Sequence, residues 1–257
     1  MDDLTIIYYT ANFISNHFQD ATKKVLLEAI GQTFLISVSQ KPMDFGENIC
    51  VGEIGRSAFN IYRQALIGAK AAKTQYVAMA EDDILYSADH FTHRPHDGFF
   101  AYDKNNWSIY TWVNPPVFSY KDRRTFYSLI CERDLLIETL EEREAKYPND
   151  KDKPILIWGE PGRYEGKMGV SRRNFEIFYS KVPNVVFSHE TALAFDNLGR
   201  RKKMGDLKAI EIPFWGRAED ILKLYDPESP FIYQWKCDGC GTKDEKNHKW
   251  DCEVFGK

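Results

Sequence analysis

The first eighty residues alternate between short apolar runs and stretches with helical periodicity. Residues 5–10 are rich in β-branched and aromatic side chains, which favours a strand. Apolar side chains then recur at helical spacing between residues 18 and 29, and Gly31 is a suitable helix stop. A second apolar run follows at residues 34–39. Strand, helix and strand in this order predict a β-α-β unit, the building block of parallel sheets.

A second helix leads to the most informative stretch of the chain. Ser57 is a suitable N-cap, and the apolar positions from 58 to 72 lie on one helical face. The apolar run 76–80 then enters three consecutive carboxylates at residues 81–83. A run of this length predicts a strand that is buried on both faces. The acids therefore fall at the carboxyl end of a strand, the edge at which open α/β sheets bind ligands.

Glu81, Asp82 and Asp83 place like charges within a few ångströms of one another. Such crowding costs free energy unless a cation neutralises the group or the side chains spread into water. Two interpretations follow from the residues alone, a cation site and a solvated acidic turn.

The remainder of the chain predicts shorter elements. The expected strands are 99–102, 107–112, 126–130, 155–158 and 185–187, and the expected helices are 132–147 and 218–225. Together with the first third they predict an α/β protein with an open, largely parallel, Rossmann-like sheet.

Composition narrows the function classes. The 257-residue chain has a net charge of −4 and a pI near 5.9, which argues against nonspecific coating of nucleic acid. It begins without the basic start and apolar stretch of a signal peptide, and no apolar run approaches the roughly 18 residues of a membrane span. We expect a soluble, cytoplasmic protein.

The cysteines are unevenly placed. Cys50 and Cys131 stand alone in apolar surroundings, where we expect small buried side chains. The last 21 residues carry the pattern Cys-x2-Cys-x7-His-x3-Cys, formed by Cys237, Cys240, His248 and Cys252. Four such ligands in a polar tail favour a structural Zn²⁺ site, and a disulfide is the alternative.

Four features of the first third occur in an ordered set. They are Thr10-Ala11-Asn12, Gly55 to Asn60, Gly68 to Ala71, and Tyr76-Val77 followed by Glu81-Asp82-Asp83. In order and approximate spacing, residues 4–95 resemble the GT-A glycosyltransferases, especially the large inverting family 2. The sequence departs from the family pattern at Glu81, where an Asp usually stands.

The resemblance implies a nucleotide-sugar donor such as a UDP-sugar, together with Mn²⁺ or Mg²⁺. It implies that the metal binds Asp83, that Glu81 is a further metal ligand or reaches the ribose or a metal-bound water, and that Asp82 points away. The alternative is that one of the three acids caps the next turn. His189 either completes the metal shell, as a late His does in several such enzymes, or is structural. The implied donor-binding residues are Thr10, Asn12, Ser39, Arg56, Asn60, Glu81 and Asp82.

Other candidates lie further along the chain. Transfer with inversion needs a carboxylate that takes the proton of the acceptor hydroxyl. Glu160 is the first candidate, in a glycine-rich segment after an apolar run, and Glu165 and Glu190 follow. The basic segment 200–203, with Arg200 and Arg201, either closes over the diphosphate or is a solvated run of charge.

The expected organisation has three parts. Residues 1–98 bind the donor, residues 99–235 bind the acceptor, and residues 236–257 form the zinc tail. The acceptor is either a saccharide of a surface-glycan precursor or a hydroxymethylated DNA base, the latter suggested by basic segments and a lysine-rich tail. The alternatives are a nucleotidyltransferase that acts on a sugar phosphate and a zinc-tethered binding module. The first ordinarily has a loop with Gly and Lys near the N-terminus, and residues 10–17 contain neither.

Overall fold

The computed structural model describes residues 3–149, 159–192 and 204–227. The chain forms two compact units. Unit 1 contains residues 1–106 and 122–185, and unit 2 contains residues 107–121 and 186–257. The expected boundary near residue 98 does not coincide with this division, because strands after residue 98 pair within the sheet of unit 1.

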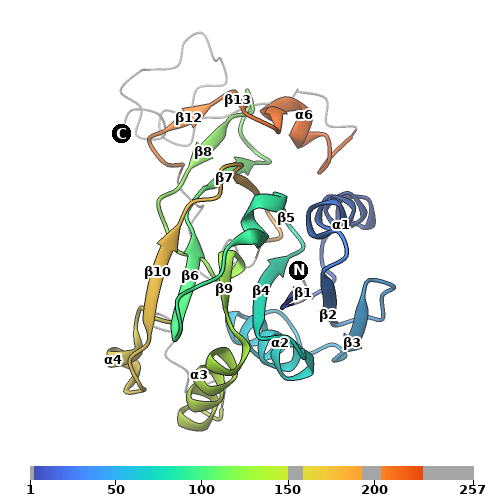
Figure 1. Ribbon diagram of the computed structural model, residues 1–257. Coiled ribbons are helices and arrows are strands. Elements are labelled where there is room, and N and C mark those ends of the chain that lie inside the picture. The colour runs from blue at the N-terminus through green and yellow to red at the C-terminus, as the bar shows by residue number, and fades with distance from the viewer. Residues whose placement is uncertain (1–2, 150–158, 193–203, 228–257) are drawn as a thin grey trace. The chain divides into compact units, whose positions relative to one another are not determined.

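Unit 1 is built on a seven-stranded, largely parallel sheet, so the prediction of a Rossmann-like α/β fold is confirmed (Figure 1). In spatial order the strands are β10 (Asn174–Phe178), β6 (Phe99–Asp103), β9 (Leu129–Glu132), β4 (Tyr76–Glu81), β1 (Leu4–Thr10), β2 (Phe34–Ser39) and β3 (Glu47–Cys50). β9 runs antiparallel to β4 and β6, whereas the other pairs are parallel.

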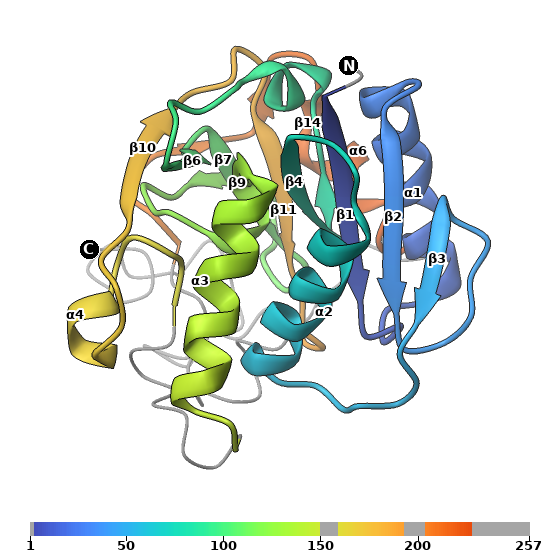
Figure 2. The ribbon, with the colours of Figure 1, turned by 60° about the horizontal axis from the view of Figure 1, so that its bottom comes forward.

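Helices cover both faces of this sheet. Figure 2 shows α2 (Ala58–Ala71) and α3 (Arg133–Lys146) in front of the strands and α1 (Asn16–Ile30) behind them. Ser57 caps α2 as predicted, because its Oγ accepts the N–H of Asn60 at 3.1 Å. Gly31 ends α1 with a φ of 57°, a conformation that glycine adopts without strain. Shorter elements are β5 (Ile84–Leu85), α4 (Glu165–Met168) and the 3-10 turns η1 (Ala88–Thr92) and η2 (Phe126–Ser128).

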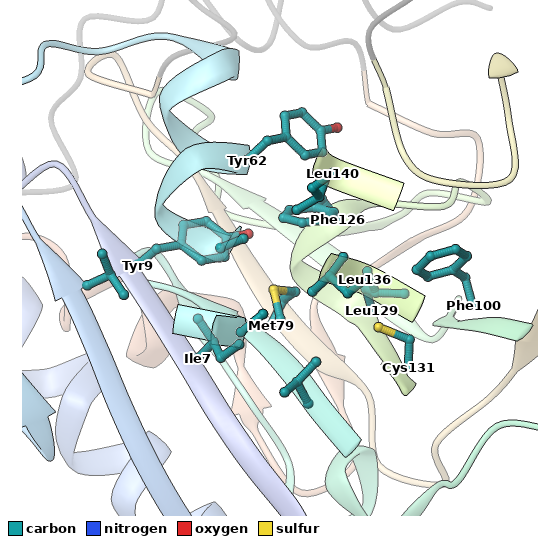
Figure 3. Packing of buried hydrophobic residues seen from close by; sticks show 14 of the residues in the cluster. Ile7, Tyr9, Tyr62, Met79, Phe100, Phe126, Leu129, Cys131, Leu136 and Leu140 are labelled. Carbon is teal, nitrogen blue, oxygen red and sulfur yellow. The ribbon is translucent and has the colours of Figure 1, made fainter. Parts of the chain in front are cut away.

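The main core lies between the sheet and the pair α2 and α3 (Figure 3). Residues 77–80 of β4 are fully buried, which confirms the prediction of a strand covered on both faces. Cys131 is buried as expected. Cys50 is exposed, so its predicted burial is wrong: it ends β3, the strand at one edge of the sheet. The expected strand 126–130 is also corrected, since η2 precedes β9 there.

Gly68 lets α2 approach β1 closely. A Cβ at this position would lie 2.5 Å from Cγ2 of Ile7 and 3.2 Å from Cγ2 of Val38. We expect Gly68→Ala to lower the free energy of unfolding by about 1–3 kcal/mol, because overpacking outweighs the better helix propensity of Ala. Urea unfolding followed by circular dichroism measures this. Gly166→Ala is the matched control, since a Cβ at Gly166 has no neighbour within 4 Å. Equal stability of the two variants would contradict close packing at Gly68.

Unit 2 contains a smaller sheet in which neighbouring strands are β12 (Lys208–Ala209), β8 (Phe118–Tyr120), β7 (Asn106–Tyr110) and β11 (Asn184–Ser188), the last two beginning in unit 1. Ile109, Phe118 and Phe187 are fully buried in it. A two-stranded hairpin, β13 (Glu211–Ile212) and β14 (Gly216–Arg217), precedes α6 (Ala218–Leu222), which is shorter than the predicted helix. Among the described residues, no helix is long and apolar enough to cross a membrane.

Candidate functional site

Three parallel strands of unit 1 end at one edge of the sheet. In the register of β1 with β4, Tyr9 lies opposite Glu81, and in the register of β1 with β2, Thr10 lies opposite Ser39. The segments that follow these strands therefore begin side by side. The sequence-based placement of the acids at the carboxyl end of a sheet strand is confirmed, and the end of β4 is next to the end of β1.

Side-chain hydrogen bonds join the segments after β1, β2 and β4. The hydroxyl of Thr10 donates to Oδ2 of Asp82 at 2.5 Å and accepts the N–H of Asn12 at 2.8 Å. Oδ1 of Asn12 accepts the N–H groups of Gln40 and Lys41, both at 2.9 Å. Asn12 has a φ of 53°, which Asn tolerates better than most residues. The hydrogen bond to Thr10 fixes one oxygen of Asp82, a predicted donor-binding residue.

The segment before α2 joins the same edge. The side chain of Gln40 makes two hydrogen bonds with the backbone of Gly55, donating to its carbonyl at 2.7 Å and accepting its N–H at 3.2 Å. Nδ2 of Asn60 donates to the carbonyls of Ile54 and Gly55 at 2.7 and 2.8 Å. Asn60, a predicted donor-binding residue, is buried and holds this segment in place. We name the joined segments 10–13, 40–41, 54–60 and 81–83 the carboxyl-edge cluster.

Two further predicted donor-binding residues differ in exposure. Ser39 is fully buried, and its hydroxyl donates to the carbonyl of Lys41 at 2.7 Å and accepts Nδ2 of Asn48 at 2.9 Å. Ser39 therefore supports the turn after β2. Arg56 lies over the ring of Phe13, 3.9 Å from its centroid, and Phe13 is 57% exposed. The cluster thus presents an aromatic ring and a guanidinium at its surface.

Glu81 sits in a network of buried tyrosines. The hydroxyl of Tyr9 donates to Oε1 of Glu81 at 2.8 Å, and the backbone N–H of Glu81 donates to the hydroxyl of Tyr86 at 3.0 Å. Tyr86 in turn donates to the carbonyl of Tyr127 at 3.1 Å. Burial, and then the charge of Glu81, raise the pKa of Tyr9 and of Tyr86 well above the ordinary value. Both hydroxyls stay protonated at neutral pH, so Tyr9 orients the Glu81 carboxylate as a hydrogen-bond donor.

Glu160 lies close to the same network. The pKa of the Tyr62 hydroxyl is raised first by burial and then by the negative charge of Glu160, with a further contribution from Glu81. The Tyr62 ring packs on Phe126 at a centroid distance of 4.6 Å, and Figure 3 shows Tyr9, Tyr62 and Phe126 together. The negative charges of Glu160 and Glu81 thus both contribute to the raised pKa of the Tyr62 hydroxyl. A role for Glu160 as general base stays a prediction.

The other two candidate bases have different surroundings. Glu165 is 4% exposed, and its Oε1 accepts Nη2 of Arg143 at 2.8 Å and the N–H of Gly162 at 2.6 Å. A carboxylate held in this way anchors the segment that carries Glu160. Glu190 is exposed and belongs to unit 2.

His189, the proposed additional metal ligand, also belongs to unit 2 and is buried. Its Nδ1 lies 2.8 Å from Oγ1 of Thr191, and its ring centroid lies 5.6 Å from that of Tyr225. The acids belong to unit 1, and a shared metal shell stays a prediction.

The acids do not form a complete metal centre by themselves. Within residues 3–149, 159–192 and 204–227, no group of three or more His, Cys, Asp or Glu side chains is arranged to hold a metal ion. A hard divalent cation that also binds substrate phosphates needs only one or two carboxylates. Asp83 and Glu81, at the end of β4, have the chemistry for that role. Arg200, Arg201 and the predicted zinc ligands Cys237, Cys240, His248 and Cys252 lie outside the described residues.

Sequence reasoning missed several residues of the site. Tyr9 and Tyr62 were taken as apolar members of a strand and a helix, and Tyr86 and Gln64 were passed over. Nε2 of Gln64 donates to the carbonyls of Thr10 and Val38 at 2.9 and 2.8 Å and so ties β1 to β2. The signal for Tyr9 was present, because a parallel β1–β4 pair places the last residues of both strands opposite each other.

Comparison with known proteins finds distant similarity to solved structures. Neither a protein-family model nor a curated protein matches the chain. A nucleotidyl transferase from Methanothermobacter thermautotroptrophicus is 14% identical at a TM-score of 0.41, covering 71% of this chain and 89% of that one. A glycosyltransferase involved in the glycosylation of the major capsid of PBCV-1 is 10% identical at a TM-score of 0.41, covering 71% and 92%. The bifunctional IspDF from Campylobacter jejuni is 9% identical at a TM-score of 0.35, covering 70% of this chain and 50% of its own length. Likenesses this distant do not identify an activity.

Proposed function

We propose that this chain is a glycosyltransferase that takes a sugar from a nucleotide-sugar donor bound at the carboxyl-edge cluster. The observation that carries the proposal is the hydrogen-bonded assembly of four segments, far apart in sequence, around consecutive acids at the end of β4. Open α/β sheets bind ligands at this edge. Three of the motifs that resemble GT-A enzymes, Thr10 to Asn12, Gly55 to Asn60 and the acids at 81–83, fall on these same segments.

The exposed groups of the cluster suit the parts of a nucleotide. The ring of Phe13 offers an apolar surface for a base, and the guanidinium of Arg56 beside it suits a phosphate oxygen. Asn12 and Thr10 hold the segment that carries Phe13. In this proposal the nucleoside lies over segment 10–13 and the diphosphate extends toward residues 81–83.

Asp83 and Glu81 would hold Mn²⁺ or Mg²⁺ together with the diphosphate. The metal, when bound, supplies positive charge to the departing diphosphate. Neighbouring residues of the chain position these acids. Tyr9 fixes the orientation of the Glu81 carboxylate, and Thr10 holds Asp82 at the strand end, so that Asp83 continues from a fixed backbone.

Glu160 is the proposed general base. It would take the proton of the acceptor hydroxyl as that oxygen forms its bond to the sugar carbon, while the bond to the diphosphate breaks. Nη1 of Arg163 lies 3.2 Å from Oε2 of Glu160, and the Glu160 side chain stays 18% exposed. Glu165 is not retained for this role, because Arg143 and Gly162 occupy its carboxylate.

A donor panel tests the proposal. We expect a UDP-sugar or a related nucleotide sugar to raise the melting temperature in the presence of Mn²⁺, and to be hydrolysed slowly. Asp83→Asn is expected to reduce that hydrolysis by about 10²–10³-fold, the range seen when one electrostatic contact to developing charge is lost. Asp134→Asn, an exposed acid of α3, is the matched control and should leave the rate unchanged.

Two results would contradict the proposal. The first is the absence of any thermal shift with nucleoside diphosphates and Mn²⁺. The second is consumption of a nucleoside triphosphate and a sugar 1-phosphate with release of pyrophosphate, which would make the chain a nucleotidyltransferase.

A further inference from the structure

The hairpin of unit 2 ends in an aromatic tip. Glu211 pairs with Arg217 and Ile212 pairs with Gly216 in antiparallel register, which leaves a three-residue connection at 213–215. This connection reads Pro213-Phe214-Trp215. The tip is therefore short, and two large aromatic residues occupy it.

The backbone at Phe214 is strained. Its φ of 74° lies in the left-handed region, where a bulky aromatic residue is an outlier and where Gly, Asn or Asp costs less. Its side chain is 73% exposed, more than any other large hydrophobic residue in the described part of the chain. Neither turn geometry nor core packing explains a phenylalanine here. Strain of this kind is associated with positions whose side chain serves a ligand.

The two rings form one preorganised unit. Phe214 and Trp215 meet edge to face, with centroids 4.8 Å apart and an interplanar angle of 89°. The base of the hairpin is anchored, because Ile212 is 3% exposed and the N–H of Ala218 donates to the carbonyl of Ile210 at 2.9 Å. An anchored base with an exposed tip presents the rings in a fixed orientation.

The surroundings indicate the class of ligand. Four acidic and three basic side chains lie between residues 206 and 223, so there is no basic surplus of the kind that nucleic acid or an anionic membrane requires. Glu211 and Arg217 form an exposed pair of strand residues in the same hairpin. Nε of Arg217 donates to Oε1 of Glu219 at 2.7 Å, and the other N–H groups of its guanidinium and the Glu211 carboxylate suit hydroxyl groups. Aromatic rings with a balanced polar rim suit a neutral saccharide, which has C–H groups on its ring faces and hydroxyls at its edges.

We propose that the Phe214–Trp215 tip binds a neutral saccharide. The proposal rests on the hairpin of unit 2 alone and does not depend on the proposed transfer reaction.

Phe214→Gly is the most direct test of saccharide binding by the tip. Glycine adopts a φ of 74° freely, so the variant removes the ring and relieves the backbone at once, and we expect its melting temperature to be no lower than that of the wild type. Binding of the full chain to maltose, cellobiose, lactose and chitobiose is measured by saturation-transfer difference NMR. We expect at least one of these sugars to bind, and Phe214→Gly to weaken its binding about ten-fold or more.

Phe175→Ala is the matched control, because Phe175 is also an exposed large aromatic residue, at 41%, and belongs to unit 1. It should leave saccharide binding unchanged. Trp215→Phe keeps a ring at the tip and should retain most of the binding, whereas Trp215→Ala should not.

Several outcomes would overturn the inference. The first is equal saccharide binding by the wild type and Phe214→Gly, and the second is that no sugar of the panel binds. The third is that Phe214→Gly loses self-association or binding to phosphatidylcholine vesicles and keeps its saccharide binding. The two proposals fail separately. Donor hydrolysis by the wild type, together with saccharide binding that Phe214→Gly does not weaken, would overturn the proposal for the tip. Saccharide binding that depends on Phe214, without any donor binding, would overturn the proposed glycosyltransferase function.

Discussion

Arg143→Met is expected to lower the free energy of unfolding by about 3–5 kcal/mol, because it leaves a buried carboxylate without its cation. The Arg143 side chain is fully buried. Its Nη2 lies 2.8 Å from Oε1 of Glu165, and its Nη1 donates to the carbonyl of Gly159 at 2.7 Å. After the change, the Gly162 N–H is the hydrogen-bond donor that remains from this arrangement. Urea unfolding followed by circular dichroism measures the loss.

The double variant Arg143→Met with Glu165→Leu separates the ion pair from the packing. Removing both charges should recover a large part of the stability, since a buried pair replaced by apolar side chains is often neutral. Lys70→Met is the surface control: Lys70 pairs with Glu141 at 2.7 Å, both side chains are about half exposed, and such pairs contribute little. Arg143→Met as stable as Lys70→Met would show that the buried pair does not hold unit 1 together.

Asp103→Asn is expected to have the second largest effect, about 3 kcal/mol at neutral pH. Asp103 is fully buried, and its Oδ2 lies 2.9 Å from Nδ1 of His90. Its Oδ1 accepts the N–H groups of Asn105 at 2.8 Å and Ser180 at 3.2 Å. The amide of the variant cannot accept from all these donors as a carboxylate does.

Asp103 also makes the free energy of unfolding depend on pH in the acid range. Burial raises the pKa of Asp103, but the hydrogen bond and charge of His90, with the hydrogen bonds of Ser180 and Asn105, outweigh it, and the pKa is lowered. Because the folded pKa lies below the unfolded value of about 3.9, the contribution is complete above that value and is lost as pH falls through the folded pKa. Wild type should therefore lose stability below about pH 4 more steeply than Asp103→Asn.

Thermal unfolding between neutral pH and pH 3 measures this difference. Asp220→Asn, an exposed acid that pairs with Lys223 at 2.7 Å, is the control and should follow the wild-type curve. Parallel acid curves for wild type and Asp103→Asn would show that folding does not lower the pKa of Asp103, and would contradict this prediction.

The elements that sequence reasoning found are those with local signals. The β-α-β start, the caps Ser57 and Gly31, and the buried strand that ends at Glu81 all depend on residues close together in the chain. The carboxyl-edge position of the acids followed from them, since parallel strands with helical crossovers carry their ligands there.

The remainder depends on contacts between distant residues. β9 runs antiparallel between β4 and β6, and no local pattern distinguishes such an insertion from a parallel strand. The buried role of Glu165 depends on Arg143, 22 residues away in sequence. Cys50 sits in an apolar sequence context but on an edge strand, so its exposure follows from sheet order and not from its neighbours.

The interrupted chain of unit 1 has a consequence for synthesis on the ribosome. Residues 107–121 belong to unit 2, and the chain then returns to unit 1. The sheet of unit 1 therefore lacks β9 until about residue 132 has emerged, and β10 until about residue 178 has emerged. β1, β2 and β4 are complete by residue 81 and are close in sequence, so they are able to pair early. The nascent chain would then present the acids at the end of β4 before the strand that later covers its flank has been made.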